Sequence, residues 1–223
     1  MLKEKAKLIL VLLLIVTLGI IGYFAFQQNQ NKISSCIAKD YLGTYNEEAG
    51  VAVFEEQEFD VPKLAEANEE KNVLGVADPN QRWIEIDLSD QRLRAWDGNN
   101  LFLESPVSTG LPWWPTPKGE FRIWIKLRYS DMEGGEGKYY YNLPNVPYVM
   151  FFENENVPGW RGYGLHGTYW HNDFGTRRSH GCVNLPTSVA GQLFYWTNPN
   201  LKENAWTAFS SADNPGTRVV IHE

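Results

Sequence analysis

Short segments in the second half of the chain follow a two-residue hydrophobic period. Residues 83–88 alternate isoleucine and leucine with glutamate and aspartate, as in a strand with one buried face. Ser-Asp and Asp-Gly-Asn-Asn turns separate this segment from residues 91–96 and 101–107, so we expect the three to pair as a meander. Further strands are expected at residues 119–125, 147–152, 164–167 and 217–222. The pattern predicts a mainly β domain with one or two short helices.

Two segments depart from this strand pattern. Thr187 has the residue type of an N-cap and precedes a helical apolar face that includes Val189, Leu193 and Phe194. Lys126 to Val146 instead contains glycines, acidic residues and three consecutive tyrosines. We expect it to be a long irregular connection, and such connections are commonly functional loops.

Lysines precede a long apolar run at the N-terminus. Leu8 to Phe26 carries no charged residue, and about 20 apolar residues cross a bilayer as a helix. Lysines before such a segment favour a cytoplasmic N-terminus. We therefore expect residues 1–26 to be a cytoplasmic tip and a transmembrane anchor, with the rest of the chain outside the cytoplasm. A cleaved signal peptide is the alternative.

Residues 27–80 are acidic, and their apolar residues are few and weakly periodic. We expect an extracytoplasmic stem or linker here, with one short helix over residues 61–71, and a globular domain over residues 81–223. The sequence Ile-Ser-Ser-Cys at residues 33–36 resembles a lipobox, which would make Cys36 a lipidated N-terminus. A polar run separates it from the apolar segment, so a stem cysteine without a lipid is favoured.

Charge and cysteine content narrow the class of protein. The net charge of −7 and the isoelectric point near 5.2 argue against nucleic-acid binding, which requires a basic surface. Two cysteines cannot form a disulfide framework. No cofactor motif is present. His166 and His171 are close enough in the sequence to be considered as metal ligands, but they lie on a glycine-containing loop that offers no third ligand. No metal site is therefore expected.

Residues 165–185 concentrate the candidate chemistry, because they hold three of the four histidines and one of the two cysteines. A free cysteine thiol has a pKa of about 8.5 and needs a base to become a nucleophile at neutral pH. His180 is two residues from Cys182 on the same short turn and is badly placed for in-line proton transfer. A histidine on a separate strand can point at the sulfur. We therefore expect Cys182 to be the nucleophile and His166 the base.

The segment Ser179-His180-Gly181-Cys182 is expected to form a tight turn. Gly181 lets the backbone approach a reacting carbonyl, and the N–H groups of the turn are candidates for an oxyanion hole. Asn184 is expected to orient the turn through side-chain hydrogen bonds. His171 is expected to lie behind the catalytic residues or at the surface.

The order of these residues resembles the signature of the L,D-transpeptidase (YkuD-type) catalytic domain, a histidine followed by Ser-His-Gly-Cys-hydrophobe-Asn. Further resemblance lies upstream, in the segments IEIDLSDQRLRAW, PVSTG and PTPKGEFRI. The similarity covers roughly residues 82–222. It implies a β-sandwich or barrel in which the Gly167 carbonyl fixes the tautomer of His166, and in which residues 126–146 form a lid.

The resemblance also implies the substrate. It would be a peptidoglycan stem tetrapeptide, cut before its terminal D-alanine and joined to the third residue of a neighbouring stem, with carbapenems as inhibitors. The candidate substrate-binding residues are Ser179, Asn184, Arg177, Arg178, Tyr148 and Met150. Guanidinium groups at the mouth of a thiol site would hold a substrate carboxylate. An L,D-carboxypeptidase, with water as acceptor, and an inactive wall-binding module remain alternatives.

Overall fold

The computed structural model describes residues 5, 7, 14–23, 37–38, 40–63 and 82–223. The chain divides into two units, Met1–Ser34 and Ser35–Glu223. Within the expected membrane anchor, residues 14–23 are helical and the rest lies outside the described residues. No helix of the described part is long and apolar enough to cross a membrane. Cys36 and most of the helix expected over residues 61–71 also lie outside it.

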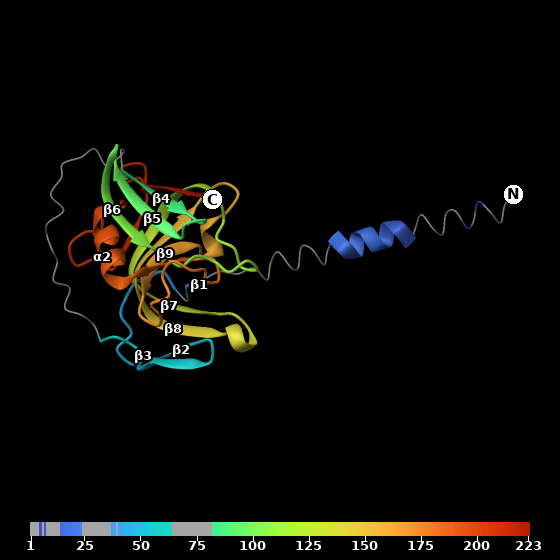
Figure 1. The fold of residues 1–223 in the computed structure, drawn as a ribbon, viewed down its shortest axis with the longest axis horizontal. Helices are drawn as coiled ribbons and strands as arrows, with labels where there is room; N and C mark the ends of the chain where they lie inside the picture. Colours follow the sequence, from blue (N-terminus) through green and yellow to red (C-terminus); the bar gives the residue numbers. More distant parts are fainter. Residues whose placement is uncertain (1–4, 6, 8–13, 24–36, 39, 64–81) are drawn as a thin grey trace. The chain divides into compact units, whose positions relative to one another are not determined.

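A twelve-stranded sheet organises the second unit (Figure 1). Its main path runs β10-β9-β8-β7-β12-β4-β5-β6, with β1 and β11 paired to β7. The strands of the path are β4 (Arg82–Asp87), β5 (Arg92–Asp97), β6 (Asn100–Pro106), β7 (Gly119–Gly134), β8 (Tyr141–Glu153), β9 (Gly164–Thr168), β10 (Val183–Pro186) and β12 (Arg218–His222), and the two side strands are β1 (Ile37–Ala38) and β11 (Thr207–Phe209). The mainly β architecture predicted from the sequence is confirmed.

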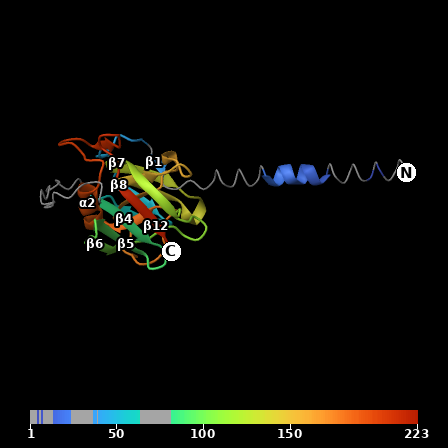
Figure 2. The same cartoon turned by 90° about the horizontal axis from the view of Figure 1, so that it is seen from above.

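The register of the sheet follows the alternation read from the sequence. β4, β5 and β6 pair antiparallel as a meander, with Ile84 opposite Ala95. β12 pairs parallel with β4 and antiparallel with β7, and Val219 faces Ile84 on one side and Phe121 on the other. Figure 2 shows β12 between these two strands. Because alternate residues of all three strands face inward, this junction forms the centre of the larger core.

The expected helix is α2 (Thr187–Trp196), which buries Leu193, Phe194 and Trp196. Its N-cap is Pro186 rather than Thr187, and no side chain caps it. The Thr187 hydroxyl is used elsewhere, donating to the Thr168 carbonyl at 3.2 Å. The helix is therefore held mainly by packing against β8 and β9.

The segment expected to be irregular, residues 126–146, is largely a two-stranded arm. β7 and β8 stay paired out to Gly134 opposite Tyr141, with bulges after Ile123 and Ser130. Between the strands lies one turn of 3-10 helix, η2 (Gly137–Tyr139). Tyrosine favours strands, and the bulges bend the arm without breaking its pairing. The lid expected from the family resemblance is therefore an extension of the sheet.

Residues 51–60 form a hairpin, where the sequence predicted a stem. β2 (Val51–Phe54) and β3 (Gln57–Asp60) pair with each other, and β2 also pairs with β8. Ala52 and Phe54 are buried in a second apolar cluster that includes Ile125, Leu127 and Phe151. The acidic residues lie on exposed or half-buried positions of the hairpin, which is why composition alone resembled a linker. The hairpin lies beside β8 in Figure 1.

A buried lysine ties β7 to the end of α2. Lys126 is fully buried, and its Nζ donates to the carbonyl oxygens of Phe194 and, at 2.7 Å, Thr197. Nζ also lies 4.5 Å from the centre of the Phe194 ring. Burial lowers the pKa of Lys126 to about 7. Thr197 caps the helix through its backbone N–H, which donates to the Leu193 carbonyl at 2.8 Å, and Lys126 binds two further carbonyl groups at this end.

The titration of Lys126 predicts a dependence of stability on pH. Between pH 7 and 10.5, the unfolded chain binds this proton and the folded chain does not. The free energy of unfolding should therefore rise with pH in this window, by up to about 1.4 kcal/mol per pH unit, and the contribution is lost as pH falls to 7. Urea unfolding at several pH values checks this. Lys126→Met should remove the slope and Lys118→Met, an exposed control, should keep it. Equal slopes in all three proteins would contradict the assignment.

Candidate active site

A small cavity brings together four residues of the predicted site. His166, Ser179, His180 and Asn184 all line it, and its volume is about 20 Å³. They arrive from β9, from the loop before β10 and from β10 itself. Phe54 of the N-terminal hairpin lines the same cavity. The sequence placed His166 and the Ser-His-Gly-Cys segment together, and the structure does so as well.

Cys182 lies just before β10 and is fully buried. Its Sγ is 3.5 Å from the carbonyl oxygen of Gly162, to which the thiol donates. Gly162 has the left-handed conformation, with φ of 70°, and follows the short helix η3 (Gly159–Arg161). The sulfur packs in the same apolar cluster as Tyr141 and Trp170, which line the cavity.

His166 stands on β9 with its ring 1% exposed. Nδ1 lies 3.1 Å from the carbonyl oxygen of Gly167, the contact that the family resemblance implied. A Nδ1–H donated to this carbonyl leaves Nε2 as a proton acceptor. Within the described part of the chain, Nε2 is buried and has no hydrogen-bond partner. A buried nitrogen left unpaired is costly and is expected where a reacting partner will meet it.

The turn that carries Cys182 is closed by the Ser179 hydroxyl. Its Oγ donates to the Cys182 carbonyl at 2.5 Å and accepts the Gly181 N–H at 3.0 Å. Gly181 has φ of 116°, which a side chain would strain. Because its N–H is bonded to Ser179, Gly181 differs from the open oxyanion donor that the sequence predicted. Ser179 lines the cavity but acts on the turn.

Thr116, on a second loop, stabilises the same turn. It was not among the residues predicted from the sequence, although it lies in the PTPKG segment. Its Oγ1 donates to the Gly181 carbonyl at 2.8 Å and accepts the Gly110 N–H at 2.9 Å. A Cβ on Gly110 would lie 2.1 Å from the Trp114 carbonyl oxygen and 2.9 Å from the Gly181 Cα. The loop and the turn therefore approach each other more closely than a side chain would permit.

His180 is held between aromatic rings. Its ring centre lies 4.2 Å from that of Trp114 and 4.9 Å from that of Tyr141. A Cβ built on Gly135, in the β7–β8 arm, would come within 3.2 Å of its Nε2. These contacts fix the ring under the arm. Trp114 packs on His180, whereas its neighbour Trp113 is half exposed.

His171 is buried, and both ring nitrogens have partners. Nδ1 accepts the Asp173 N–H at 3.2 Å, and Nε2 lies 2.8 Å from Asn184 Nδ2. A neutral imidazole accepts at one nitrogen only, so with Nδ1 accepting, Nε2 carries the proton and the Asn184 amide is turned over, which brings its oxygen to Nε2. Burial, assisted by the nearby charge of Arg178, lowers the pKa of His171 to about 4. His171 is therefore neutral at pH 7 and positions Asn184.

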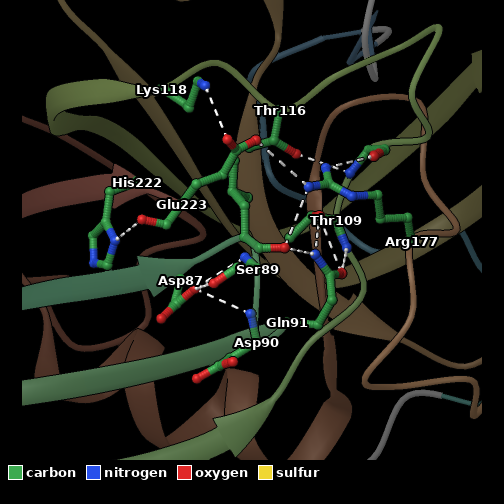
Figure 3. A network of polar contacts seen from close by, with 12 residues as sticks. Asp87, Ser89, Asp90, Gln91, Thr109, Thr116, Lys118, Arg177, His222 and Glu223 are labelled. Carbon is green, nitrogen blue, oxygen red and sulfur yellow. Dashed lines mark hydrogen bonds and ion pairs between the residues drawn. The ribbon is translucent and has the colours of Figure 1, made fainter.

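The two arginines have different surroundings. Arg177 does not line the cavity; it donates to the carbonyl oxygens of Gly110 (3.3 Å) and Leu88 (3.2 Å), within a network that joins three loops (Figure 3). Its expected contact with substrate is not supported by this placement, because its guanidinium braces loops instead. Arg178 lies beside the cavity wall, 3.2 Å from Glu55 Oε2 and 3.2 Å from Asp173 Oδ2.

Tyr148 and Met150 were expected to wall the pocket, and they do not. Both belong to β8 but face α2: Tyr148 packs on Phe194, with ring centres 5.6 Å apart, and Met150 is buried in the larger core. The Thr197 hydroxyl donates to the Met150 sulfur at 3.4 Å. The arrangement corrects the prediction, because the register of β8 turns these side chains to the helix side.

Solved structures of L,D-transpeptidases match the chain, whereas none of the curated proteins compared with it does. A mutant of the Enterococcus faecium L,D-transpeptidase is 28% identical, with a TM-score of 0.48, over 64% of this chain and 50% of that one. An L,D-transpeptidase from Mycobacterium smegmatis is 20% identical, with a TM-score of 0.50, over 64% of this chain and 59% of that one. An L,D-transpeptidase in complex with imipenem is 21% identical, with the same TM-score and coverage.

The matched region holds the catalytic candidates described above. The chain spans about half the length of the first solved relatives. A sequence model of the L,D-transpeptidase catalytic domain (YkuD) matches residues 81–221, which is more than half of the chain and includes the whole Ser-His-Gly-Cys turn. The hairpin of β2 and β3 lies outside this region. The chain therefore belongs to the L,D-transpeptidase (YkuD) catalytic domain family.

Proposed function

We propose that the protein is a peptidoglycan L,D-transpeptidase that cross-links stem peptides through a thioester on Cys182. The observation that carries this proposal is the state of His166. Its Nδ1 is engaged by the Gly167 carbonyl, and its buried Nε2 lines the cavity beside the Cys182 turn without a hydrogen-bond partner in the described residues. This is the arrangement of a base that is oriented by one nitrogen and reacts with the other.

In the first half-reaction, His166 Nε2 takes the proton of Cys182 Sγ, and the thiolate attacks the carbonyl that precedes the terminal D-alanine of a donor tetrapeptide. The tetrahedral oxyanion accepts hydrogen bonds from backbone N–H groups of the turn at His180 and Cys182, since the N–H of Gly181 is bonded to Ser179. Collapse breaks the C–N bond. His166 returns its proton to the leaving D-alanine amine, and a thioester remains.

In the second half-reaction, the side-chain amine of the third residue of a neighbouring stem attacks the thioester carbonyl. His166 accepts a proton from this amine and gives it to the departing sulfur, which restores the thiol. The steps move protons and one acyl group and call for no metal or redox cofactor. If water replaces the amine, the same thioester gives L,D-carboxypeptidase activity, and the test below separates the two.

Three further assignments belong to this proposal. Arg178, half exposed beside the cavity, binds a carboxylate of the stem peptide. Asn184 and Ser179 act on the turn rather than on the substrate, through His171 and through the backbone respectively. The apolar run Leu8 to Phe26, with lysines before it, anchors the protein in the membrane with the catalytic domain on the cell-wall side.

Turnover of a disaccharide tetrapeptide with an acceptor stem, followed by mass spectrometry, tests the reaction. The wild type should give a dimer that has lost one alanine per bond. Cys182→Ala should give none, and His166→Ala should lower kcat/KM by about a hundredfold or more. His171→Ala should lose much less, and His222→Gln, on the exposed end of β12, should be unaffected. Tripeptide without dimer would identify a carboxypeptidase, and an equal loss in the His166 and His171 variants would contradict the assignment of the base.

Acylation by a carbapenem is a separate prediction. A family member has been solved in complex with imipenem, and a β-lactam carbonyl is an acyl donor for the same thiolate. Intact-mass spectrometry of this protein with imipenem should show one adduct, and peptide mapping should locate it on Cys182. Cys182→Ala keeps Cys36 and should show none. An adduct on Cys36, or none on the wild type, would count against the proposed nucleophile.

A further inference from the structure

The residues that line the catalytic cavity are buried. Cys182 is 0% exposed, and the cavity beside it has a volume of about 20 Å³. A space of this size holds about one water molecule. A peptide carbonyl must come into contact with Sγ for the proposed reaction, so part of the wall has to move first.

One wall of this cavity comes from the N-terminal hairpin. Phe54, the last residue of β2, lines the cavity and is 4% exposed. Its ring centre lies 6.2 Å from that of Trp170 and 6.0 Å from that of His171, and the Arg178 guanidinium carbon lies over the ring, 5.6 Å from its centre. An aromatic side chain from outside the family domain thus fills space next to the proposed base.

Glu55, the next residue, forms an ion pair with Arg178, the arginine that the proposed function assigns to substrate binding. Glu55 Oε2 lies 3.2 Å from Arg178 Nη1, and the Glu55 N–H donates to the Tyr140 carbonyl at 3.2 Å. A carboxylate on this guanidinium occupies the position that a stem-peptide carboxylate would need.

The hairpin turn that carries Glu55 has a backbone conformation that is unfavourable for glutamate. Glu55 and Glu56 both have positive φ, 50° and 65°, in a two-residue turn of the kind that favours asparagine and glycine. Residues held in the left-handed region persist where their surroundings impose it, and they cluster at clamps and switches. Here the two-residue connection between Phe54 and Gln57 imposes the conformation, and it places Glu55 beside Arg178.

The hairpin is also the more weakly attached of the two elements over the cavity. β2 pairs with β8 at two positions, Val53 opposite Asn142 and Phe54 opposite Tyr141. The β7–β8 arm is continuous with the sheet and paired from Arg122 to Gly134. Elements with few pairings open at the lowest free energy.

We infer that the β2–β3 hairpin is a gate on the catalytic site, in which Phe54 blocks access to Cys182 and the Glu55 carboxylate holds Arg178 until an anionic stem peptide replaces it. The inference rests on the proposed function for the identity of the competing carboxylate. The closure itself rests on the cavity, the rings and the ion pair.

Labelling of Cys182 by iodoacetamide measures the gate without requiring turnover. The full chain is used, the adduct on Cys182 is distinguished from that on Cys36 by peptide mapping, and rates are taken on the alkaline plateau, where changes in thiol pKa no longer matter. Phe54→Ala and Glu55→Gln should each label about tenfold faster than the wild type, the change expected for loss of one aromatic or cation–π contact or one ion pair of the closed state.

Two variants of the same hairpin serve as controls. Phe59→Ala removes a ring, and Glu58→Gln removes a charge, but neither residue lines the cavity or contacts Arg178. Both should label at the wild-type rate, and unfolding midpoints of all variants show whether general loosening contributes. Equal rates in the wild type and both gate variants would overturn the gate, as would equal acceleration by the controls.

The two proposals can fail separately. Faster labelling of the gate variants with no transpeptidation or hydrolysis by any protein would leave the gate standing and remove the proposed function. Normal turnover by a wild type whose Cys182 labels as fast as in the urea-unfolded chain would remove the gate and leave the function.

Discussion

Two hydroxyl groups hold the turn that carries Cys182 in place. Ser179 Oγ and Thr116 Oγ1 together bind four backbone groups, at Gly110, Gly181 (both its N–H and its carbonyl) and Cys182. A turn with φ of 116° at its glycine is not a low-energy arrangement for an isolated chain. Its geometry therefore depends on the loops between β6 and β7, which deliver Thr116, and on the strand β10 that follows. Buried hydroxyls of this kind are strong constraints, because removing one leaves several polar groups unsatisfied.

The second apolar cluster shows that the folded unit is larger than the family domain. Ile125, Leu127 and Phe151 lie on the outer face of β7 and β8, and the residues before position 64 cover them. The Tyr41 ring lies edge-on to the rings of Trp124 and Phe151 there. The Thr207 hydroxyl donates to the carbonyl oxygens of Tyr41 and Leu42, which ties this segment to β11. Phe54 belongs to this cluster and is 4% exposed, and burying one such side chain stabilises the fold by about 1.5–3 kcal/mol. The covering segment therefore contributes to the stability of the domain and to the wall of the candidate active-site cavity.

The candidate catalytic residues and the meander were recognisable in the sequence because both are local patterns. His166 and Cys182 are marked by their neighbours, β4 and β5 by alternation of buried and more exposed positions, and all three strands by clear turns between them. The hairpin could not be predicted, since the acidic residues around Ala52 and Phe54 dominate the composition of that stretch. The sequence also could not show which face of β8 carries Tyr148 and Met150. Each bulge in the β7–β8 pairing shifts the faces of the strand by one residue, and bulges cannot be located from the sequence pattern. The sequence left two positions open for His171, behind the catalytic residues or at the surface, because its burial depends on Phe54, more than a hundred residues away.

The position of β12 has a consequence for how the protein is made. Arg218–His222 come after all the other described strands along the chain, yet they lie between β7 and β4 in the sheet. While a ribosome is still synthesising residue 217, both neighbours of this strand have already emerged with open edges. Such edges are templates for pairing with other chains. A chain released before residue 218 would carry two of them, so premature termination near the C-terminal end should produce aggregation rather than a slightly shortened domain.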